Sequence, residues 1–286
     1  MECAWDAYRR LLSGWIRSEV DKQDVGVLQE TRLRIGKPPE LVTHNGSVFL
    51  KGCTTQEDIS YSINAASQYS PWSATTSANG YITAPGGHRV GICGDTVLKN
   101  GEMTGFSAAR YLCIRVARDF PSIAEKAADL QGSVLLIGPP CSGKTTFLRD
   151  MIRYMSQRKN GSVAVVDERG ELFPSVECGH CFNIGNRTDV ITGCSKSHGI
   201  NTVLKTMSPA IIAVDEITSR DDCEALMDVR SCGVNVLATA HAGCVEDLYR
   251  RAVYKPLMEE EIFNYIIVFK RDKSWKIERM HKCTGN

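Results

Sequence analysis

The chain has 286 residues, 23% of them charged, and a formal net charge of +1 at pH 7. This length predicts one or two domains, and the 43% hydrophobic content is sufficient for globular cores. The balanced charge argues against a general attraction to nucleic acid or to a membrane surface. No apolar run approaches the ~18 residues of a membrane span, and the first residues lack the apolar segment of a signal peptide, so we expect a cytoplasmic protein.

The first half of the chain is predicted to mix helices and strands, and we assign residues 1–125 to a smaller α+β domain. Apolar residues recur at helical spacing over Trp5–Val20, which predicts a core-facing helix, with a membrane-surface helix as the alternative. Glu30–Ile35 alternates like a strand. The glycines of Gly80–Gly94 indicate hairpin turns or close backbone approach, and Tyr111–Arg118 is predicted to be a further strand.

The chain is predicted to divide near residues 120–132, around a helical stretch at Ile123–Leu130, and we assign residues 126–286 to the second domain. Apolar strands alternate there with helical stretches, which is typical of an α/β fold whose mostly parallel sheet is covered on both faces. The predicted strands are Val134–Ile137, Val163–Val166, Ile211–Val214, Val234–Thr239 and Tyr265–Phe269, and the predicted helices are Thr145–Gln157 and Glu224–Arg230.

Residues Gly138–Thr145 match the G-x-x-x-x-G-K-[ST] pattern of a phosphate-binding loop, between an apolar strand and a helix. Backbone N–H groups and the helix N-terminus surround the β-phosphate in such a loop. We expect Lys144 to contact the β- and γ-phosphates and the Thr145 hydroxyl to hold Mg²⁺. The predicted nucleotide-binding residues of the loop are Gly138, Pro139, Pro140, Cys141, Ser142, Gly143, Lys144, Thr145 and Thr146.

Acidic residues follow two of the predicted strands. Asp215 is expected to hold Mg²⁺, directly or through water, and Glu216 to act as general base on the attacking water. Asp167 and Glu168 repeat this design on another strand, where Glu168 is a rival to Glu216 as the base. The alternative for these two acids is a strand-end cap in a salt bridge with Arg169.

His241 ends the segment Thr239-Ala240-His241, which follows the next apolar strand. A polar residue at that position often lies beside the γ-phosphate and senses hydrolysis. A structural histidine is the alternative, and the residues alone leave both interpretations open.

The pair Cys178 and Cys181 has the C-x-x-C spacing of redox and zinc sites. A zinc site needs two more ligands, and only Cys194 and His198 lie nearby, at a loose spacing. We interpret the pair as a coincidence among twelve scattered cysteines.

The order of these motifs resembles the stage III sporulation protein AA family, the ATPases of endospore-forming bacteria, over roughly residues 28–283. The motifs that carry the resemblance are Gly138–Thr145, Val166–Arg169, Arg187–Val190 with Gly193-Cys194, Met207–Pro209, Val214–Ile217, Thr239–Ala242 with Glu246–Leu248 and, in the first half, Glu30–Pro38 and Gly80–Gly94. One departure is Thr218-Ser219-Arg220, which stands where a Gly-Arg pair is expected.

That family is similar to the motor ATPases of type II and type IV secretion, which join an N-terminal domain to a RecA-like core and work as hexameric rings. The resemblance implies ATP and Mg²⁺ as cofactors, an Asp box at Asp167-Glu168 and a His box at His241. It also implies arginines of the N-terminal domain that reach the nucleotide, with a solvated or structural arginine as the alternative. The candidates are Arg89, Arg115 and Arg118.

The predicted function is therefore an ATP-hydrolysing motor in the mother-cell cytoplasm, peripherally associated with a membrane complex. Its predicted partners are further copies of itself, in a hexamer, and the membrane-embedded proteins of a channel between mother cell and forespore. A nucleic-acid-dependent ATPase is one alternative, against which the balanced charge and the lack of a basic module argue. A nucleotide-binding switch with little turnover is the other.

Overall fold

The chain divides into two structural units after Asp119. In this computed structural model the first unit comprises Met1–Asp119 and Pro174–Cys181, and the second comprises Phe120–Phe173 and Phe182–Asn286. The structure describes residues 2–24, 26–68, 80–158, 161–176 and 179–280. Cys178 of the C-x-x-C pair lies outside these ranges. None of the helices in the described part has both the length and the apolar content that a bilayer crossing requires.

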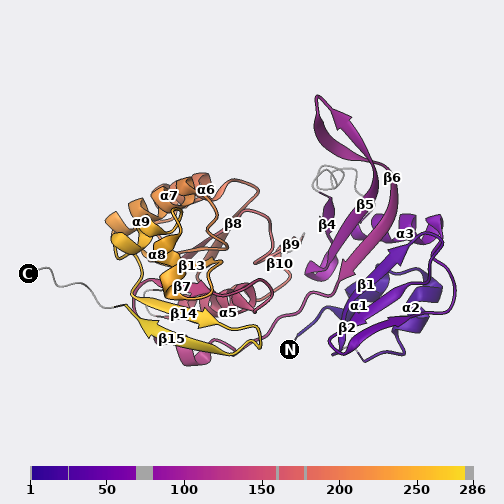
Figure 1. The fold of residues 1–286 in the computed structure, drawn as a ribbon, viewed down its shortest axis with the longest axis horizontal. Helices are drawn as coiled ribbons and strands as arrows, with labels where there is room; N and C mark the ends of the chain where they lie inside the picture. Colours follow the sequence, from indigo (N-terminus) through magenta and orange to yellow (C-terminus); the bar gives the residue numbers. More distant parts are fainter. Residues whose placement is uncertain (1, 25, 69–79, 159–160, 177–178, 281–286) are drawn as a thin grey trace, which may run out of the picture. The chain divides into compact units, whose positions relative to one another are not determined.

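A six-stranded antiparallel sheet forms the centre of the first unit, with strand order β3-β2-β1-β6-β5-β4 (Figure 1). The strands are β1 (Leu28–Arg34), β2 (Glu40–Thr43), β3 (Gly46–Phe49), β4 (Tyr81–Thr83), β5 (Arg89–Lys99) and β6 (Glu102–Arg115). Leu33 and Ile114 of the sheet share one buried core with residues of α1 (Trp5–Arg10), α2 (Gly14–Val20) and α3 (Gln56–Ala66). The helices therefore cover one face of this sheet.

The single helix predicted over Trp5–Val20 is wrong, because the segment forms two helices, α1 and α2, with a break at Leu11–Ser13. Ser13 adopts extended backbone angles and precedes Gly14, and both residue types are poor in a helix interior. The break lets Leu11 and Leu12 both be buried, with 1% and 0% of their surface exposed. The apolar spacing thus correctly predicted that these side chains are buried, but not that the helix is interrupted.

The second unit contains a seven-stranded sheet with order β11-β8-β12-β13-β7-β14-β15. Its strands are β7 (Val134–Ile137), β8 (Val163–Asp167), β11 (Thr188–Thr192), β12 (Ile211–Val214), β13 (Asn235–Ala240), β14 (Tyr265–Phe269) and β15 (Trp275–Arg279). The pairings are parallel except for the edge pair β14–β15. The predicted α/β fold with a mostly parallel sheet is confirmed. The short hairpin β9 (Ser175–Val176) and β10 (Gly179–His180) lies outside this sheet.

Helices bury both faces of this sheet, as the continuous apolar strands predict. Val134 and Leu136 of β7 share a core with α5 (Lys144–Ser156), whereas Leu135 and Ile137 share a core with the opposite helices. This alternation is the two-residue period of a strand. The opposite helices are α6 (Lys196–Thr206), α7 (Arg220–Ser231), α8 (Val245–Arg250) and α9 (Lys255–Glu259).

The helix predicted at Ile123–Leu130 is a single 3₁₀ turn, Glu125–Ala127. Ala124 and Ala127 are both fully buried, and residues three apart lie on the same side of a 3₁₀ turn. The backbone N–H of Ala124 donates to Asp150 Oδ2 on α5 at 2.9 Å. A short turn therefore attaches this segment to the second unit just before β7.

Candidate nucleotide site

The predicted phosphate-binding loop lies between β7 and α5, at the carboxyl edge of the parallel strands. Gly143 precedes α5 with φ +96°, a left-handed conformation that favours glycine. Gly138 contacts the end of β14 so closely that a Cβ atom there would lie 2.8 Å from Phe269 Cβ. Both glycines are therefore required by the path of the loop.

The Lys144 side chain folds back over the loop that precedes it. Its Nζ donates to the carbonyl oxygens of Gly138 and Pro139, each at 2.9 Å, and only 6% of the residue is exposed. Burial lowers the pKa of Lys144, while the nearby carboxylates of Asp215 and Glu216 raise it. The ammonium group is thus held at the loop and lies in the field of both acids that follow β12.

Thr239 joins the two acids through one hydroxyl group, although it was not among the predicted site residues. Its Oγ1 donates to Asp215 Oδ1 at 2.6 Å and accepts the backbone N–H of Glu216 at 2.8 Å. The residue is 1% exposed. Its position at the end of β13, beside β12, is the only signal that could have identified it.

Asp215, the predicted metal ligand after β12, accepts a hydrogen bond from the side chain of the loop residue Thr145. Burial raises the pKa of Asp215, and hydrogen bonds from Thr239 and Thr145 act in the opposite direction. Among the described residues, no group of three or more His, Cys, Asp or Glu side chains could hold a metal alone. Two oxygen ligands nevertheless fit Mg²⁺, which takes one or two protein ligands and completes its shell with phosphates and water.

His241 connects Lys144 to Glu216. Its Nδ1 lies 3.4 Å from Lys144 Nζ, and its Nε2 lies 3.1 Å from Glu216 Oε1. Since an ammonium group only donates, Nδ1 accepts from Lys144 and Nε2–H donates to Glu216. The Arg251 guanidinium donates to the His241 carbonyl at 2.6 Å, which helps to fix the backbone at this residue.

The two acids after β8 have other partners. Asp167 is 2% exposed and accepts the backbone N–H groups of Glu171, Leu172 and Phe173, each at 2.9 Å. Asp167 therefore closes the turn that follows β8. Burial raises its pKa, while these three hydrogen bonds act to lower it.

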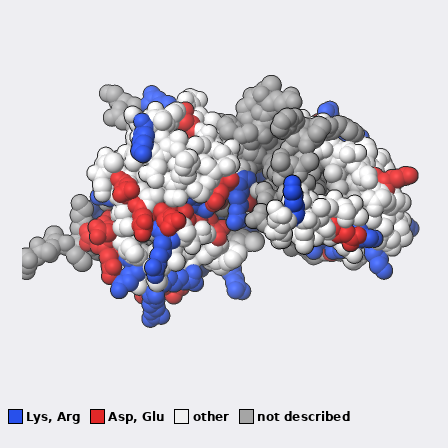
Figure 2. All heavy atoms as spheres, turned by 90° about the horizontal axis from the view of Figure 1, so that it is seen from above, with Lys and Arg blue, Asp and Glu red and all other residues white. Residues whose placement is uncertain are grey.

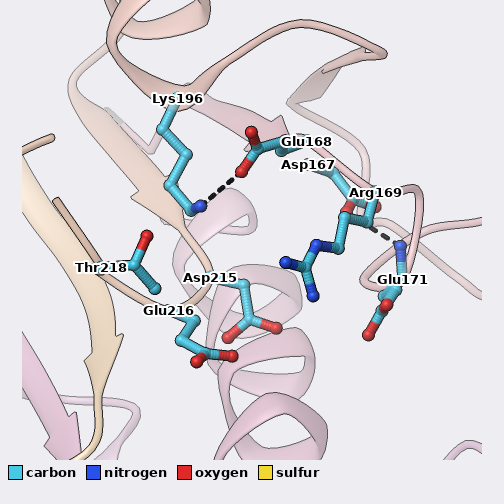
Figure 3. A pocket seen from close by; sticks show the side chains of 8 residues that line it. All are labelled: Asp167, Glu168, Arg169, Glu171, Lys196, Asp215, Glu216 and Thr218. Atoms are coloured by element: carbon cyan, nitrogen blue, oxygen red, sulfur yellow. Dashed lines mark hydrogen bonds and ion pairs between the residues drawn. The ribbon is translucent and has the colours of Figure 1, made fainter. Parts of the chain in front are cut away.

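Glu168 pairs with Lys196, at 2.5 Å between Oε2 and Nζ. Figure 3 shows this pair on one side of a small cavity of about 40 Å³, with Asp215 and Glu216 on the other side. Lys196 was not among the predicted site residues. The position of Lys196 could have drawn attention to it, because the residue lies in the first turn of α6, where the helix dipole disfavours a positive charge.

A larger cavity of about 750 Å³ opens over the phosphate-binding loop. Its volume is within the range of small-molecule sites. The Oγ atom of Ser142 is buried in the loop without a hydrogen-bond partner among the described residues, and it lines this cavity. An unsatisfied buried hydroxyl fits a site that is completed by a polar ligand such as a phosphate group. The site residues that line the cavity are Pro140, Cys141, Ser142, Gly143, Lys144, Thr145, Thr146, Asp215, Glu216, Thr239 and His241.

The three candidate arginines belong to the first unit. Arg89 and Arg115 are directly opposite each other on β5 and β6, so their side chains share one face of that sheet. The Arg89 guanidinium lies 3.9 Å from the centre of the Tyr81 ring, and the Arg115 side chain is 65% exposed. Arg118 donates to the carbonyl oxygen of Leu28. Arg118 thus has a structural contact, and Arg115 is largely exposed although its Nε lies 3.8 Å from Glu30 Oε2.

The fold and this loop define a P-loop protein with a RecA-like core. The family model described as "Sporulation stage III, protein AA" matches residues 5–283. Stage III sporulation protein AA of Bacillus subtilis strain 168 is 35% identical over 280 residues, which cover 94% of this chain and 91% of that protein. The chain therefore belongs to the stage III sporulation protein AA family.

Solved structures share the architecture at low sequence identity. The pilus retraction motor PilT, solved with bound ADP, aligns with a TM-score of 0.62 and 16% identity, over 93% of this chain and 83% of that one. The ATPase DotB of Legionella pneumophila aligns with a TM-score of 0.54 and 16% identity, over 88% of this chain and 75% of that one. At this identity the likeness concerns the fold.

Proposed function

We propose that this protein is a Mg²⁺-dependent ATPase that acts as a motor for a secretion-like sporulation complex. The observation that carries the proposal is the chain of contacts from Lys144 through His241 to Glu216, directly over the phosphate-binding loop. The relation in fold to a pilus motor with bound ADP and to the ATPase DotB supports nucleotide binding and turnover. Membership of a sporulation family supports the biological setting.

Each group of the site has a distinct role in this proposal. Lys144 neutralises the charge of the β- and γ-phosphates, and Thr145 with Asp215 holds the metal ion. Mg²⁺, when bound, would stabilise negative charge on the phosphate oxygens. Glu216 orients the attacking water and accepts its proton, and His241 holds the Glu216 carboxylate through Nε2–H. The closeness of His241 to both Lys144 and Glu216 favours a role beside the γ-phosphate over a purely structural one.

Glu216 is a better candidate for the base than Glu168. The Glu168 carboxylate is engaged by the Lys196 ammonium at 2.5 Å, so this ion pair would have to open before Glu168 could orient a water molecule. Asp167 accepts three backbone N–H groups and is buried, so it serves the turn rather than the reaction. We therefore propose that the Asp-box acids shape the edge of the site, while Glu216 takes part in the proton transfer.

The assembly is proposed to be a homo-oligomeric ring, a hexamer, in which arginines of the first unit reach nucleotide. Arg115 is the strongest candidate because it is exposed, and Arg89 shares its sheet face. The ring would work in the mother-cell cytoplasm, attached peripherally to membrane-embedded channel proteins that it energises. The alternative function, a nucleic-acid-dependent ATPase, gains no support from the net charge of +1. The face shown in Figure 2 does not support it either, because positive and negative side chains are interspersed there.

The test is the ATPase rate of the full chain against protein concentration, with mass by light scattering, with and without ATP and Mg²⁺. We expect the rate per subunit to rise as a ring forms. Lys144→Ala should abolish nucleotide binding or hydrolysis. A rate that is constant in concentration and comes from a monomer would contradict the ring. Stimulation by a single-stranded oligonucleotide, lost at raised salt, would favour the nucleic-acid-dependent alternative.

A further inference from the structure

The 750 Å³ cavity has two chemically different ends, and the strand order sets them apart. The phosphate-binding loop follows β7, and β7 lies between β13 and β14. The polar groups, among them Asp215 and His241, come from the β12–β13 side. The residues from the β14–β15 side are Phe269, Lys273 and Trp275. A nucleoside triphosphate whose γ-phosphate faces Glu216 would therefore place its base toward β14 and β15.

The β14–β15 end has an aromatic wall that is fixed by its own contacts. Phe269 and Trp275 are directly opposite each other in the strand register. The Phe147 ring lies beneath both, edge to face, with ring centres 5.1 Å from Phe269 and 5.0 Å from Trp275. Phe147 and Phe269 are buried, whereas Trp275 is partly exposed and lines the cavity. Trp275 thus presents a large ring surface that packs edge to face against the buried Phe147 ring.

The chain that leads into β7 adds apolar groups to the same end. Phe120 and Ile123 line the cavity, and Ile123 is 37% exposed. Of the described side chains at this end, the Lys273 ammonium and the Trp275 indole N–H are the polar groups, and both only donate. Both purines offer a ring nitrogen, N7, that can accept from such a donor.

From this lining we infer that the site binds purine nucleotides through stacking and apolar contact, without distinguishing adenine from guanine. The inference rests on the proposed function and names the substrate class of the same site. Stacking on an aromatic ring tolerates any base because every base has a π-face. Strong discrimination requires buried polar groups matched to one base edge, and the described lining of this end has no carboxylate or amide side chain.

Calorimetric titration of the full chain with ATP, GTP, CTP and inorganic tripolyphosphate, in the presence of Mg²⁺, tests this inference. We expect the Kd values for ATP and GTP to agree within about tenfold, and CTP to bind more weakly because its ring is smaller. Trp275→Ala should weaken ATP and GTP alike, by about tenfold or more, and leave tripolyphosphate unchanged. Trp275→Phe should restore most of the lost affinity.

Ile277→Ala provides the matched control, because Ile277 lies two residues further on the same edge strand, on the same face, and does not line the cavity. It should leave all four affinities unchanged. A Kd for GTP more than a hundredfold above that for ATP would overturn the inference. So would a Trp275→Ala variant that loses tripolyphosphate binding as strongly as ATP binding. If instead Lys144→Ala left tripolyphosphate binding intact, the proposed function itself would fail.

Discussion

Thr239 donates a 2.6 Å hydrogen bond to the Asp215 carboxylate from the neighbouring strand. The same hydroxyl accepts the backbone N–H of Glu216, a residue with φ of +45°, which is uncommon for a non-glycine residue. One buried side chain therefore fixes both the proposed metal ligand and the backbone of the proposed base. The catalytic geometry depends on a residue that contacts neither phosphate nor water in our proposal.

We predict that Thr239→Val lowers kcat by about ten- to a hundredfold, because a hydrogen bond to a charged group is worth roughly 1.5–3 kcal/mol. The substitution keeps the shape of the side chain and removes only the hydroxyl. In Mg²⁺ titrations of ATPase activity, Thr239→Val should need a higher Mg²⁺ concentration than wild type to reach half-maximal activity. A merely structural role of Thr239 would not produce this change. Thr239→Ser retains the hydroxyl and should stay within a few-fold of wild type. Equal Mg²⁺ dependence in Thr239→Val and wild type would show that Thr239 does not position Asp215.

Exchanging each acid for its amide should separate the two candidate bases. Glu216→Gln should reduce kcat by roughly 10²- to 10⁴-fold while ATP binding is retained, since general base catalysis contributes about that much. Glu168→Gln should reduce kcat less than tenfold, because its partner Lys196 already occupies the carboxylate. Single-turnover hydrolysis and equilibrium binding of ATP measure both quantities. The opposite ranking of the two variants would transfer the role of base to Glu168.

The raised pKa of Asp215 predicts a pH-dependent stability effect of Asp215→Asn. Burial, the largest cause, makes the native state keep this proton at a pH where the unfolded chain has already released it. The free energy of unfolding therefore decreases as pH rises from the ordinary pKa of 3.8 through the raised native value. Asparagine cannot ionise, so the free energy of unfolding of the variant should not decrease with pH for this reason.

Without Mg²⁺ and nucleotide, Asp215→Asn should consequently be more stable than wild type at pH 7.5, and the difference should shrink as pH approaches 3.8. Denaturant unfolding of both proteins across this range is the measurement. ATPase activity of the variant should be lost. A variant that is destabilised to the same extent at every pH would contradict the proposed origin of the effect.

Asp167→Ala should destabilise the protein strongly. It removes a buried carboxylate that satisfies three backbone N–H groups, and buried donors without acceptors cost roughly 1–3 kcal/mol each before relaxation and water entry. We expect a loss of about 3 kcal/mol or more in the free energy of unfolding. Glu168→Ala, one residue away, is the control. It should cost about 1 kcal/mol or less because its carboxylate is partly exposed. Comparable losses in the two variants would refute the structural role of Asp167.

Local sequence determined much of the second unit. Val134–Ile137 and Ile211–Val214 form the strands that were predicted residue for residue, because apolar runs of this length between loops suit buried parallel strands. The phosphate-binding loop, the helix after it and the acids at two strand ends follow from the same short-range patterns. The family could also be predicted, since its motifs keep a fixed order along the chain.

Local sequence was less reliable where the same apolar spacing fits two different structures. The amphipathic spacing of Trp5–Val20 satisfied both one long helix and two short ones, and the Ser13-Gly14 pair decided for two. Ile123–Leu130 has helical spacing as well, but burial of Ala124 and Ala127 requires no more than a single turn.

Which groups of the site contact one another depends on the packing of strands and helices that are distant in the chain. Lys144 and His241 are 97 positions apart and Glu168 and Lys196 are 28 apart, so neither contact follows from spacing. Our proposal of Glu216 as the base rests on these contacts, and the proposed role of Thr239 rests on its own contacts with Asp215 and Glu216. The separation of the polar and the aromatic end of the cavity likewise follows from the place of β7 between β13 and β14. The chemical groups of the site could be predicted from the motifs, because motifs are local. Packing of strands that are distant in the chain determined their partners, because contacts across a sheet depend on strand order and register.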